Sequence, residues 1–363
     1  MTIFGQQALL APATAAAPVI PASPVHKWAT DEVAPKDRFD YWREVRAKGL
    51  FGATAELERE QRPQFFGEFA LRKIGSAGFV ELRASSYQIE RSATDIANSP
   101  GDSLCIYQQL GGGGRFRVKD HDEFCVASGG YATSYSDLPY HTVPLDAGGY
   151  DLRILKVPAA DISLPKSGLG DLAPRPFGDL AFVAPLLDSC FSDLTEAGSD
   201  GDPIAAKALV RTLAQLTLVE RGVVRPSSRI AQYAVRAGRL SLARRLIARH
   251  LAQPQLSPLY VATLLGISVR HLHVLFEEAS MSFSHTVTAL RIERSRRLLR
   301  EAPAMTIAAI AFASGFDSIA TFYRVFRAVQ GATPGDFRDA AVRDIVEAYS
   351  RSAEPGPVHL TAK

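Results

Sequence analysis

Residues 257–277 read SPLYVATLLGISVRHLHVLFE. Apolar residues recur at helical spacing on both sides of Gly266, which is the pattern that two short helices need in order to pack across a tight turn. Ser257 and Ser268 each precede one of these helices, where a serine hydroxyl can cap the free backbone N–H groups. The stretch therefore predicts a helix-turn-helix unit over residues 258–277.

A second copy of this pattern follows about fifty residues later, around Gly315. Its turn is one residue longer, and Thr306 and Ser318 stand where they can cap its two helices. A single copy of such a pattern arises easily by chance, whereas two copies at this separation do not. We therefore predict a second helix-turn-helix unit over residues 307–327.

The segment between the two units predicts one continuous helix, residues 283–300, that carries five arginines. A helix of this length spans about 27 Å. Successive major-groove openings on one face of B-DNA are roughly 34 Å apart. A rigid connector of this size lets one chain place two recognition helices in adjacent major grooves.

The charge of the chain is divided unevenly along its length. Residues 221–340 contain 17 arginines, no lysine and seven acidic residues, a net charge of +10, so the remainder carries −7 of the total of +3. This asymmetry is typical of a module for a polyanion joined to a mildly acidic partner domain. Arginine-rich helices are also often merely solvated, so the charge alone does not decide the matter.

Length and composition indicate a globular protein of two domains, since 363 residues with 47% apolar side chains exceed one ordinary core. Cys105, Cys125 and Cys190 are widely separated, which fits a reducing cytoplasm and neither a disulfide framework nor a zinc site. Residues 1–26 are rich in Ala and Pro and lack the features of a signal peptide, so a disordered tail is expected. No apolar stretch is long enough for a membrane span.

The N-terminal half predicts a different architecture. Between Phe65 and Val157, short runs of β-branched and aromatic residues alternate with glycine-containing turns, which indicates an antiparallel sandwich or barrel. Residues 185–194 and 204–218 predict amphipathic helices. The expected fold class is α+β, with flanking helices beside the strands and an all-helical C-terminal domain.

Residues 239–340 strongly resemble the DNA-binding domain of the AraC/XylS family of bacterial regulators. The residues that carry the resemblance include Leu264-Leu265-Gly266-Ile267-Ser268, Leu272 to Phe276, Ile310-Ala311, Gly315-Phe316, Phe322 to Phe326 and Gly331-Ala332-Thr333-Pro334. The chain departs from the family at Ser280, where Gly is usual, and at Ser295, where Ala is usual. Both departures concern packing or helix ends, and so put local stability in doubt rather than function.

The resemblance implies which side chains meet DNA. Base edges would be contacted by Arg270, His273 and Val274 from the first recognition helix and by Ile319, Ala320, Thr321 and Arg324 from the second. Arginine can donate two hydrogen bonds to guanine, while short apolar groups suit the thymine methyl. Phosphate contacts, which set register without reading sequence, are expected from Ser268, Arg291, Arg297 and Ser318.

Residues 39–161 resemble, more loosely, the cupin-like sensor domain of one branch of the same family. The carriers are Asp40-Tyr41-Trp42-Arg43-Glu44-Val45, Ser136-Asp137-Leu138-Pro139-Tyr140 and Leu152 to Pro158, although Gly129-Gly130 replaces the usual Gly-Asp. The resemblance implies a β-barrel that binds a small effector in its interior. Candidate pocket residues are Tyr87, Arg91, Tyr107, Gln109, Tyr135 and His141. For each of them a surface or core role is the competing interpretation.

Catalytic chemistry finds little support in the sequence. Catalytic cupins hold a metal through His-x-His and a following Glu, whereas this half offers only isolated His26, His121 and His141. No phosphate loop, serine elbow or Cys/His arrangement occurs. We therefore expect no catalytic residue, no metal and no cofactor. Cys105 and Cys125 could instead sense oxidants, but no basic group is clearly placed to lower their pKa.

These observations predict a ligand-responsive activator of a bacterial operon that acts in the cytoplasm. Its expected partners are double-stranded operator DNA, RNA polymerase, a small-molecule effector and a second copy of itself. The predicted divisions are a tail at 1–26, a sensor and dimerisation domain at 27–222, a linker at 223–238, a DNA-binding domain at 239–340 and a tail at 341–363. Two alternatives remain: a constitutive regulator whose N-terminal half only dimerises or contacts a partner, and an enzyme domain fused to a DNA-binding module.

Overall fold

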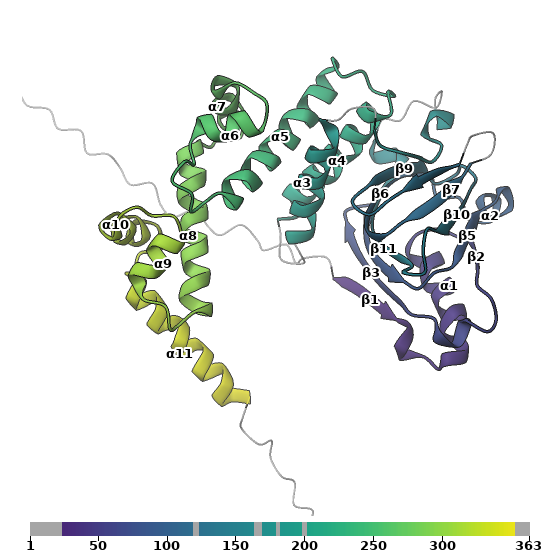
Figure 1. The fold of residues 1–363 in the computed structure, drawn as a ribbon, viewed down its shortest axis with the longest axis horizontal. Helices are drawn as coiled ribbons and strands as arrows, with labels where there is room; N and C mark the ends of the chain where they lie inside the picture. The colour runs from purple at the N-terminus through teal and green to yellow at the C-terminus, as the bar shows by residue number, and fades with distance from the viewer. Residues whose placement is uncertain (1–23, 119–122, 163–168, 179–181, 198–201, 353–363) are drawn as a thin grey trace, which may run out of the picture. The chain divides into compact units, whose positions relative to one another are not determined.

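The computed structural model describes residues 24–118, 123–162, 169–178, 182–197 and 202–352. They form two compact units (Figure 1), of which the second contains residues 182–190 and those from Pro226 onward, and the first contains the others. The expected tail at 1–26 falls outside the described residues except for its last three, and a strand already begins at Val25. No single described helix is long and apolar enough to span a membrane; one sharply bent helix pair, residues 258–264 with 269–278, passes that test only as a pair.

The first unit contains two antiparallel sheets. The larger sheet has the order β1-β3-β4-β11-β6-β9-β12 and the smaller one the order β2-β5-β10-β7-β8. The strands of the larger sheet are β1 (Val25–Ala29), β3 (Gly67–Ile74), β4 (Ala77–Ala84), β6 (Ser103–Gly112), β9 (Tyr131–Tyr135), β11 (Tyr150–Pro158) and β12 (Arg175–Pro176). Those of the smaller sheet are β2 (Thr54–Glu56), β5 (Gln88–Arg91), β7 (Gly114–Arg117), β8 (Phe124–Val126) and β10 (Tyr140–Pro144).

One apolar core fills the space between these sheets. Val80, Leu82 and Ile154 come from the larger sheet, and Ile89 and Tyr140 come from the smaller one. Alternate residues of a strand point to opposite faces, so each strand supplies every second side chain to this core. The antiparallel architecture and the α+β class are as predicted, whereas the cupin-like assignment stays a prediction.

Helix α1 (Arg38–Gly49) adds an aromatic cluster to the same core. Phe39 and Trp42 are both 1% exposed, and their rings pack edge-on or tilted against Phe65 and Tyr87. The remaining helices of the N-terminal half are α2 (Ala93–Asn98), α3 (Val183–Glu196) and α4 (Pro203–Glu220). Helices α3 and α4 confirm the two predicted amphipathic segments, and α4 packs on the larger sheet at β3, β6 and β11.

The second unit is helical. Its helices are α5 (Arg229–Arg249), α6 (Pro258–Leu264), α7 (Val269–Glu278), α8 (Phe283–Glu301), α9 (Ile307–Ala313), α10 (Ile319–Gln330) and α11 (Pro334–Ser352). Both predicted helix-turn-helix units are present as α6–α7 and α9–α10, and α8 is the predicted connector. Two expected domain boundaries fall inside helices: α5 begins within the expected linker at 223–238, and α11 continues past residue 340.

Helix α8 belongs to two separate apolar cores. Its first turns contribute Phe283 and Val287 to the core of the first helix-turn-helix unit. Its later turns contribute Ile292 and Leu299 to the core of the second. Because one rigid helix is anchored in both cores, the two units hold a fixed spacing along it.

Side-chain caps define where these helices begin. The hydroxyl oxygens of Ser257, Ser268, Thr306 and Ser318 each accept a hydrogen bond from the backbone N–H three residues later, at 3.1 to 3.4 Å. All four caps were predicted from the sequence. Each is expected to stabilise its helix by about 1 kcal/mol, since the first N–H groups of a helix have no partner within it.

Left-handed backbone occurs at both turn glycines and at Ser280. Gly266 has φ +64° and Gly315 has φ +92°. A Cβ on Gly266 would meet nothing within 4 Å, but one on Gly315 would lie 2.2 Å from the backbone oxygen of Leu251. Ser280 has φ 54° where the family usually has Gly, and its N–H and that of Met281 close the end of α7 by bonding the carbonyls of Glu277 and Phe276. The departure at Ser280 therefore places a serine in a conformation that favours glycine.

The two turn glycines make a matched test of this packing. Gly266→Ala should cost about 1 kcal/mol of unfolding free energy, since only the left-handed backbone opposes it. Gly315→Ala should cost about 3 kcal/mol or more, because the new methyl group also collides with the Leu251 carbonyl. Urea denaturation of the two variants measures both values, and equal losses would contradict the close approach seen at Gly315.

Candidate nucleic-acid interface

The two recognition helices divide cleanly into a buried and an exposed face. On α7, Leu272 and Phe276 are fully buried. On α10, Phe322 and Phe326 are fully buried. The seven residues predicted to contact bases are all exposed: Arg270, His273, Val274, Ile319, Ala320, Thr321 and Arg324. The helical period thus separates the residues that hold the units together from those that the units present to solvent.

Apolar side chains are unusually exposed on these faces. Val274 and Ile319 are 37% and 39% exposed. Val274 lies one turn after the predicted reader Arg270, and Ala320 lies one turn before the predicted reader Arg324. Such a surface combines hydrogen-bond donors with apolar groups, which is the chemistry that guanine and thymine edges offer in the major groove.

The two capping serines sit where a helix can receive a phosphate. Ser268 and Ser318 are exposed, and each uses a hydroxyl lone pair to cap α7 or α10. The hydroxyl hydrogen remains free to point at an acceptor. The first N–H groups and the positive end of the helix dipole lie at the same place, so these termini favour an anion.

The connector arginines take different roles from one another. Arg297 is exposed, with its Nε 3.8 Å from Glu301, and so remains accessible to solvent. Arg291 is partly buried, its guanidinium carbon lies 5.8 Å from the centre of the Phe316 ring, and burial lowers its pKa. Arg291 thus packs against the second helix-turn-helix unit, and its phosphate contact stays a prediction.

Two further connector arginines also pack against a ring. The guanidinium carbons of Arg296 and Arg300 lie 5.8 Å and 5.2 Å from the centre of the Phe337 ring on α11. These contacts attach α11 to α8 through cation–π attraction. Sequence reasoning missed this role, although the aromatic residue one turn into the last helix was visible.

The candidate ligand residues of the first unit do not all lie together. Tyr87, Tyr107 and Gln109 line a cavity of about 40 Å³ between the two sheets. Arg91, Tyr135 and His141 are not among the residues that line it. The predicted pocket is therefore present in part, with half of its expected lining.

Arg91 is occupied within the protein. It is fully buried, donates to the backbone carbonyls of Gly52, Ser99 and Ser136, and forms an ion pair with Asp137 at 3.3 Å. Four of its five N–H donors thus have protein partners, so no pair of donors is left for the expected two-bond pairing with a ligand carboxylate.

The other two residues outside the cavity have local explanations. Tyr135 donates its hydroxyl to the Asp102 carboxylate, and burial together with that bond raises the pKa of Tyr135. His141 lies between Tyr140 and Thr142 on β10, and because those two line the cavity, the alternation of the strand turns His141 to the other face.

Four polar residues that were not predicted as pocket residues also line the cavity: Arg46, Tyr140, Thr142 and Tyr150. Arg46 lies four residues after Trp42 and seven after Phe39, so it shares their face of α1. That spacing was readable from the sequence and would have identified Arg46 as an inward-facing charge.

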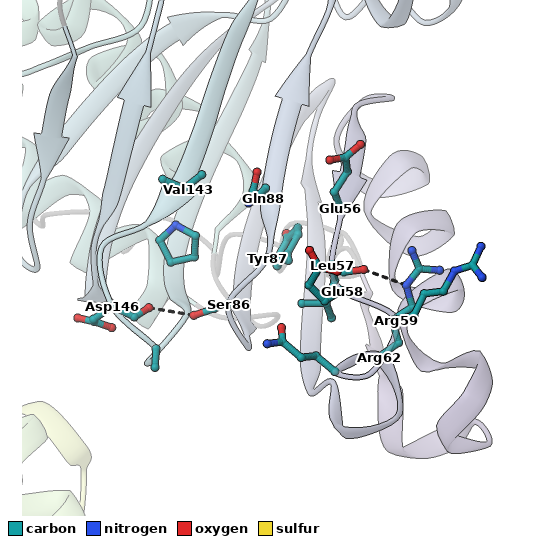
Figure 2. Close-up of a pocket in the computed structure, with 13 residues that line it drawn as sticks. Glu56, Leu57, Glu58, Arg59, Arg62, Ser86, Tyr87, Gln88, Val143 and Asp146 are labelled. Carbon is teal, nitrogen blue, oxygen red and sulfur yellow. Dashed lines mark hydrogen bonds between the residues drawn. The ribbon is translucent and has the colours of Figure 1, made fainter.

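A groove of about 600 Å³ opens beside this cavity on the surface of the first unit (Figure 2). Glu56 and Glu58 line one side and Val143 and Asp146 the other, with the side chain of Tyr87 between them. Tyr87 lines both the groove and the inner cavity. Its side chain therefore forms part of the partition between solvent and the interior of the unit.

Among the described residues, no three His, Cys, Asp or Glu side chains are grouped closely enough to hold an ion. Cys105 is fully buried, and burial raises the pKa of its thiol to about 11, so it carries no reactive thiolate at neutral pH.

Two exposed recognition helices, each in a helix-turn-helix unit and joined by one shared helix, define a sequence-specific DNA-binding protein. Comparison with known proteins agrees. The family model described as "Helix-turn-helix domain" matches residues 261–340. Over these residues the chain is similar to transcription regulators with an AraC-type helix-turn-helix domain.

Two curated proteins are similar to this chain. The HTH-type transcriptional regulator GlxA of Rhizobium meliloti (strain 1021) is 40% identical over 79 residues, which cover 22% of this chain and 24% of that protein. The Transcriptional activator NphR of a Rhodococcus species is 24% identical over 311 residues, which cover 81% of this chain and 87% of that protein. The similarity to NphR thus extends into the N-terminal half.

Solved structures of related proteins were also found. The AraC-like transcriptional activator CuxR is 20% identical and covers 80% of this chain and 100% of its own, with a TM-score of 0.48. An AraC-type transcriptional regulator from Chromobacterium violaceum is 30% identical and covers 28% of this chain and 91% of its own, with a TM-score of 0.27.

The exposed arginines yield a direct test of base recognition. Arg270→Ala or Arg324→Ala should weaken binding to a preferred sequence by roughly 1 to 3 kcal/mol while barely changing the affinity for random DNA. Arg297→Ala, if that side chain holds a phosphate, should weaken binding to both DNAs alike and lower the salt slope by about 1. Fluorescence anisotropy with a sequence selected from random DNA and with a scrambled duplex measures both affinities. Equal losses on the two duplexes for Arg270 and Arg324 would show that these residues only position the protein.

Proposed function

We propose that this protein is a ligand-responsive activator of a bacterial operon, in which the first unit binds a small molecule and the second unit binds the operator. The observation that carries the DNA-binding half is the exposure of all seven predicted base-contacting residues around two fully buried cores. The observation that supports the sensor half is a cavity between the sheets that contains a buried arginine.

The proposed base readout is shared between the two helices. Arg270 on α7 and Arg324 on α10 are the candidates for bidentate hydrogen bonds to guanine. Val274, Ala320 and the methyl group of Thr321 would contact thymine methyl groups, and His273 and Ile319 complete the two surfaces. The proposed phosphate contacts are Ser268, Ser318, Arg291 and Arg297. Of the two arginines, Arg297 is the better placed because its side chain is exposed.

Activation is the direction that the comparisons support. NphR, which is similar to this chain over both halves, is named a transcriptional activator. We propose RNA polymerase and a second copy of this chain as the protein partners, because the family resemblance implies both. The cytoplasm, where bacterial DNA lies, is the proposed location.

Two competing functions make different predictions. A constitutive regulator would bind DNA with the same affinity whatever its N-terminal cavity holds, and an enzyme fused to a DNA-binding module would convert the molecule that it binds. A ligand-responsive regulator instead releases its ligand unchanged and binds DNA and ligand cooperatively, since the coupling between two sites is reciprocal.

Calorimetric titration of a bound effector tests the proposal. Candidate effectors come from thermal-shift screening of aromatic acids, amines and short acyl compounds against the full chain. Effector affinity should rise by about 5- to 150-fold when the selected operator is present, which corresponds to the usual 1 to 3 kcal/mol of coupling. Scrambled DNA of the same length is the control. Identical affinities with operator, with scrambled DNA and without DNA would contradict control through binding.

A further inference from the structure

The cavity between the sheets contains a positive charge. Arg46 is 5% exposed and lines the cavity from α1, on the same helical face as the core residues Phe39 and Trp42. A guanidinium keeps its proton under all physiological conditions. The first unit therefore buries a permanent cation where its neighbours on α1 are aromatic.

No negative group in the described part of the chain compensates this cation. Arg46 forms no ion pair with a carboxylate there, in contrast to Arg91, which pairs with Asp137. The titratable groups that interact with Arg46 are the phenols of Tyr87, Tyr140 and Tyr107. Burial raises the pKa of all three phenols, so they are neutral at physiological pH and cannot act as counter-ions.

Two hydroxyl groups of the same cavity lack a well-aligned hydrogen bond. Tyr87 and Thr142 are 3% and 4% exposed, and their hydroxyls have only poorly aligned neighbours, Arg46 and Trp42 beside Tyr87 and Tyr150 beside Thr142. A buried polar group without a partner costs folding free energy, and a buried charge without one costs more. A buried cation without a counter-ion, beside two hydroxyls without well-aligned partners, indicates that a further molecule completes the cavity.

We infer that this cavity binds a small apolar carboxylate, whose carboxylate group pairs with Arg46. The planar guanidinium fork matches a carboxylate through two parallel hydrogen bonds. The hydroxyls of Tyr87 and Thr142 can donate to the same oxygens or to a polar substituent. This inference deepens the proposed sensor function and rests on it.

The other residues that line the cavity determine the chemistry that the rest of the ligand must have. Arg46 is the single cation among the residues that line the cavity, and apolar side chains such as Phe51, Phe116 and Leu152 form most of the surface. A second carboxylate or a phosphate dianion would therefore lack charged partners. The walls favour a monocarboxylate with an apolar body.

The size of the cavity requires it to open when the ligand enters. At about 40 Å³ it is far smaller than the roughly 300 to 1,000 Å³ of usual small-molecule pockets. Tyr87 separates it from the groove of about 600 Å³ (Figure 2). Rotation of the Tyr87 side chain would join cavity and groove. Since its hydroxyl has no well-aligned hydrogen bond, the cost of this rotation falls mainly on its contacts with the neighbouring aromatic rings.

Ligand binding by the full-length protein tests this inference without any DNA. Melting temperature and calorimetric affinity are measured with benzoate and hexanoate, and with their uncharged analogues benzamide and hexanamide. We expect the carboxylates to raise the melting temperature and the amides to leave it unchanged, because binding to the folded state alone stabilises it. No shift with either carboxylate, or equal shifts with carboxylates and amides, would overturn the inference.

Variants identify the residue responsible. Arg46→Met should weaken carboxylate binding at least tenfold and should leave the ligand-free melting temperature unchanged or higher, because it removes an uncompensated buried charge. Arg43→Met is the matched control, since Arg43 lies on the same helix with an exposed side chain, and it should bind as the wild type does. Wild-type affinity in Arg46→Met would overturn the assignment.

Two milder substitutions keep the test decisive if Arg46→Met does not fold. Arg46→Lys keeps the charge but loses the fork, and Thr142→Val keeps the volume but loses the hydroxyl, so both should weaken carboxylate binding by a smaller factor than Arg46→Met. Wild-type affinity in both would contradict the inference. Failure of all carboxylates to bind a protein that still couples another ligand to DNA would remove this inference and leave the proposed function intact.

Discussion

The second unit depends on a single helix that is buried in two cores at once. Helix α8 supplies Phe283 and Val287 to one core and Ile292 and Leu299 to the other, so the two recognition helices move only if α8 bends or a core opens. Gly315 adds to this constraint, because its turn approaches the Leu251 backbone more closely than any side chain allows. The spacing between the two DNA-reading surfaces is therefore a property of packing rather than of a flexible linker.

The same unit shows how charge and packing are combined. Of the five arginines on α8, Arg291, Arg296 and Arg300 pack over aromatic rings of the second helix-turn-helix unit or of α11. The positive charge of this helix thus attaches neighbouring elements while still adding to the field that attracts DNA. In the first unit, by contrast, the charge of Arg46 is buried without a counter-ion, which costs folding free energy.

Much of the helical unit could be predicted from the sequence because its signals are local. The caps at Ser257 and Thr306 and the glycine at Gly266 each act within three or four residues, and the structure has them as predicted. The boundary near Arg229 could not be read, because small residues such as Ala231 and Ala234 form the buried face of α5. Arg91 rather than Arg46 is predicted from the sequence as the ligand-facing arginine. The sequence could not exclude Arg91, because Arg91 pairs with Asp137, 46 residues further along the chain, and no local pattern reveals such a contact.

Selection of preferred sequences from random DNA tests the central claim, that one rigid connector sets the spacing of two readers. The account predicts two blocks of sequence preference whose centres are about 10 base pairs apart, one turn of B-DNA, for each bound chain. Substitution of Arg270 should erase preference in one block alone and substitution of Arg324 in the other. A single block of preference, or two blocks whose spacing varies freely among the selected sequences, would contradict it.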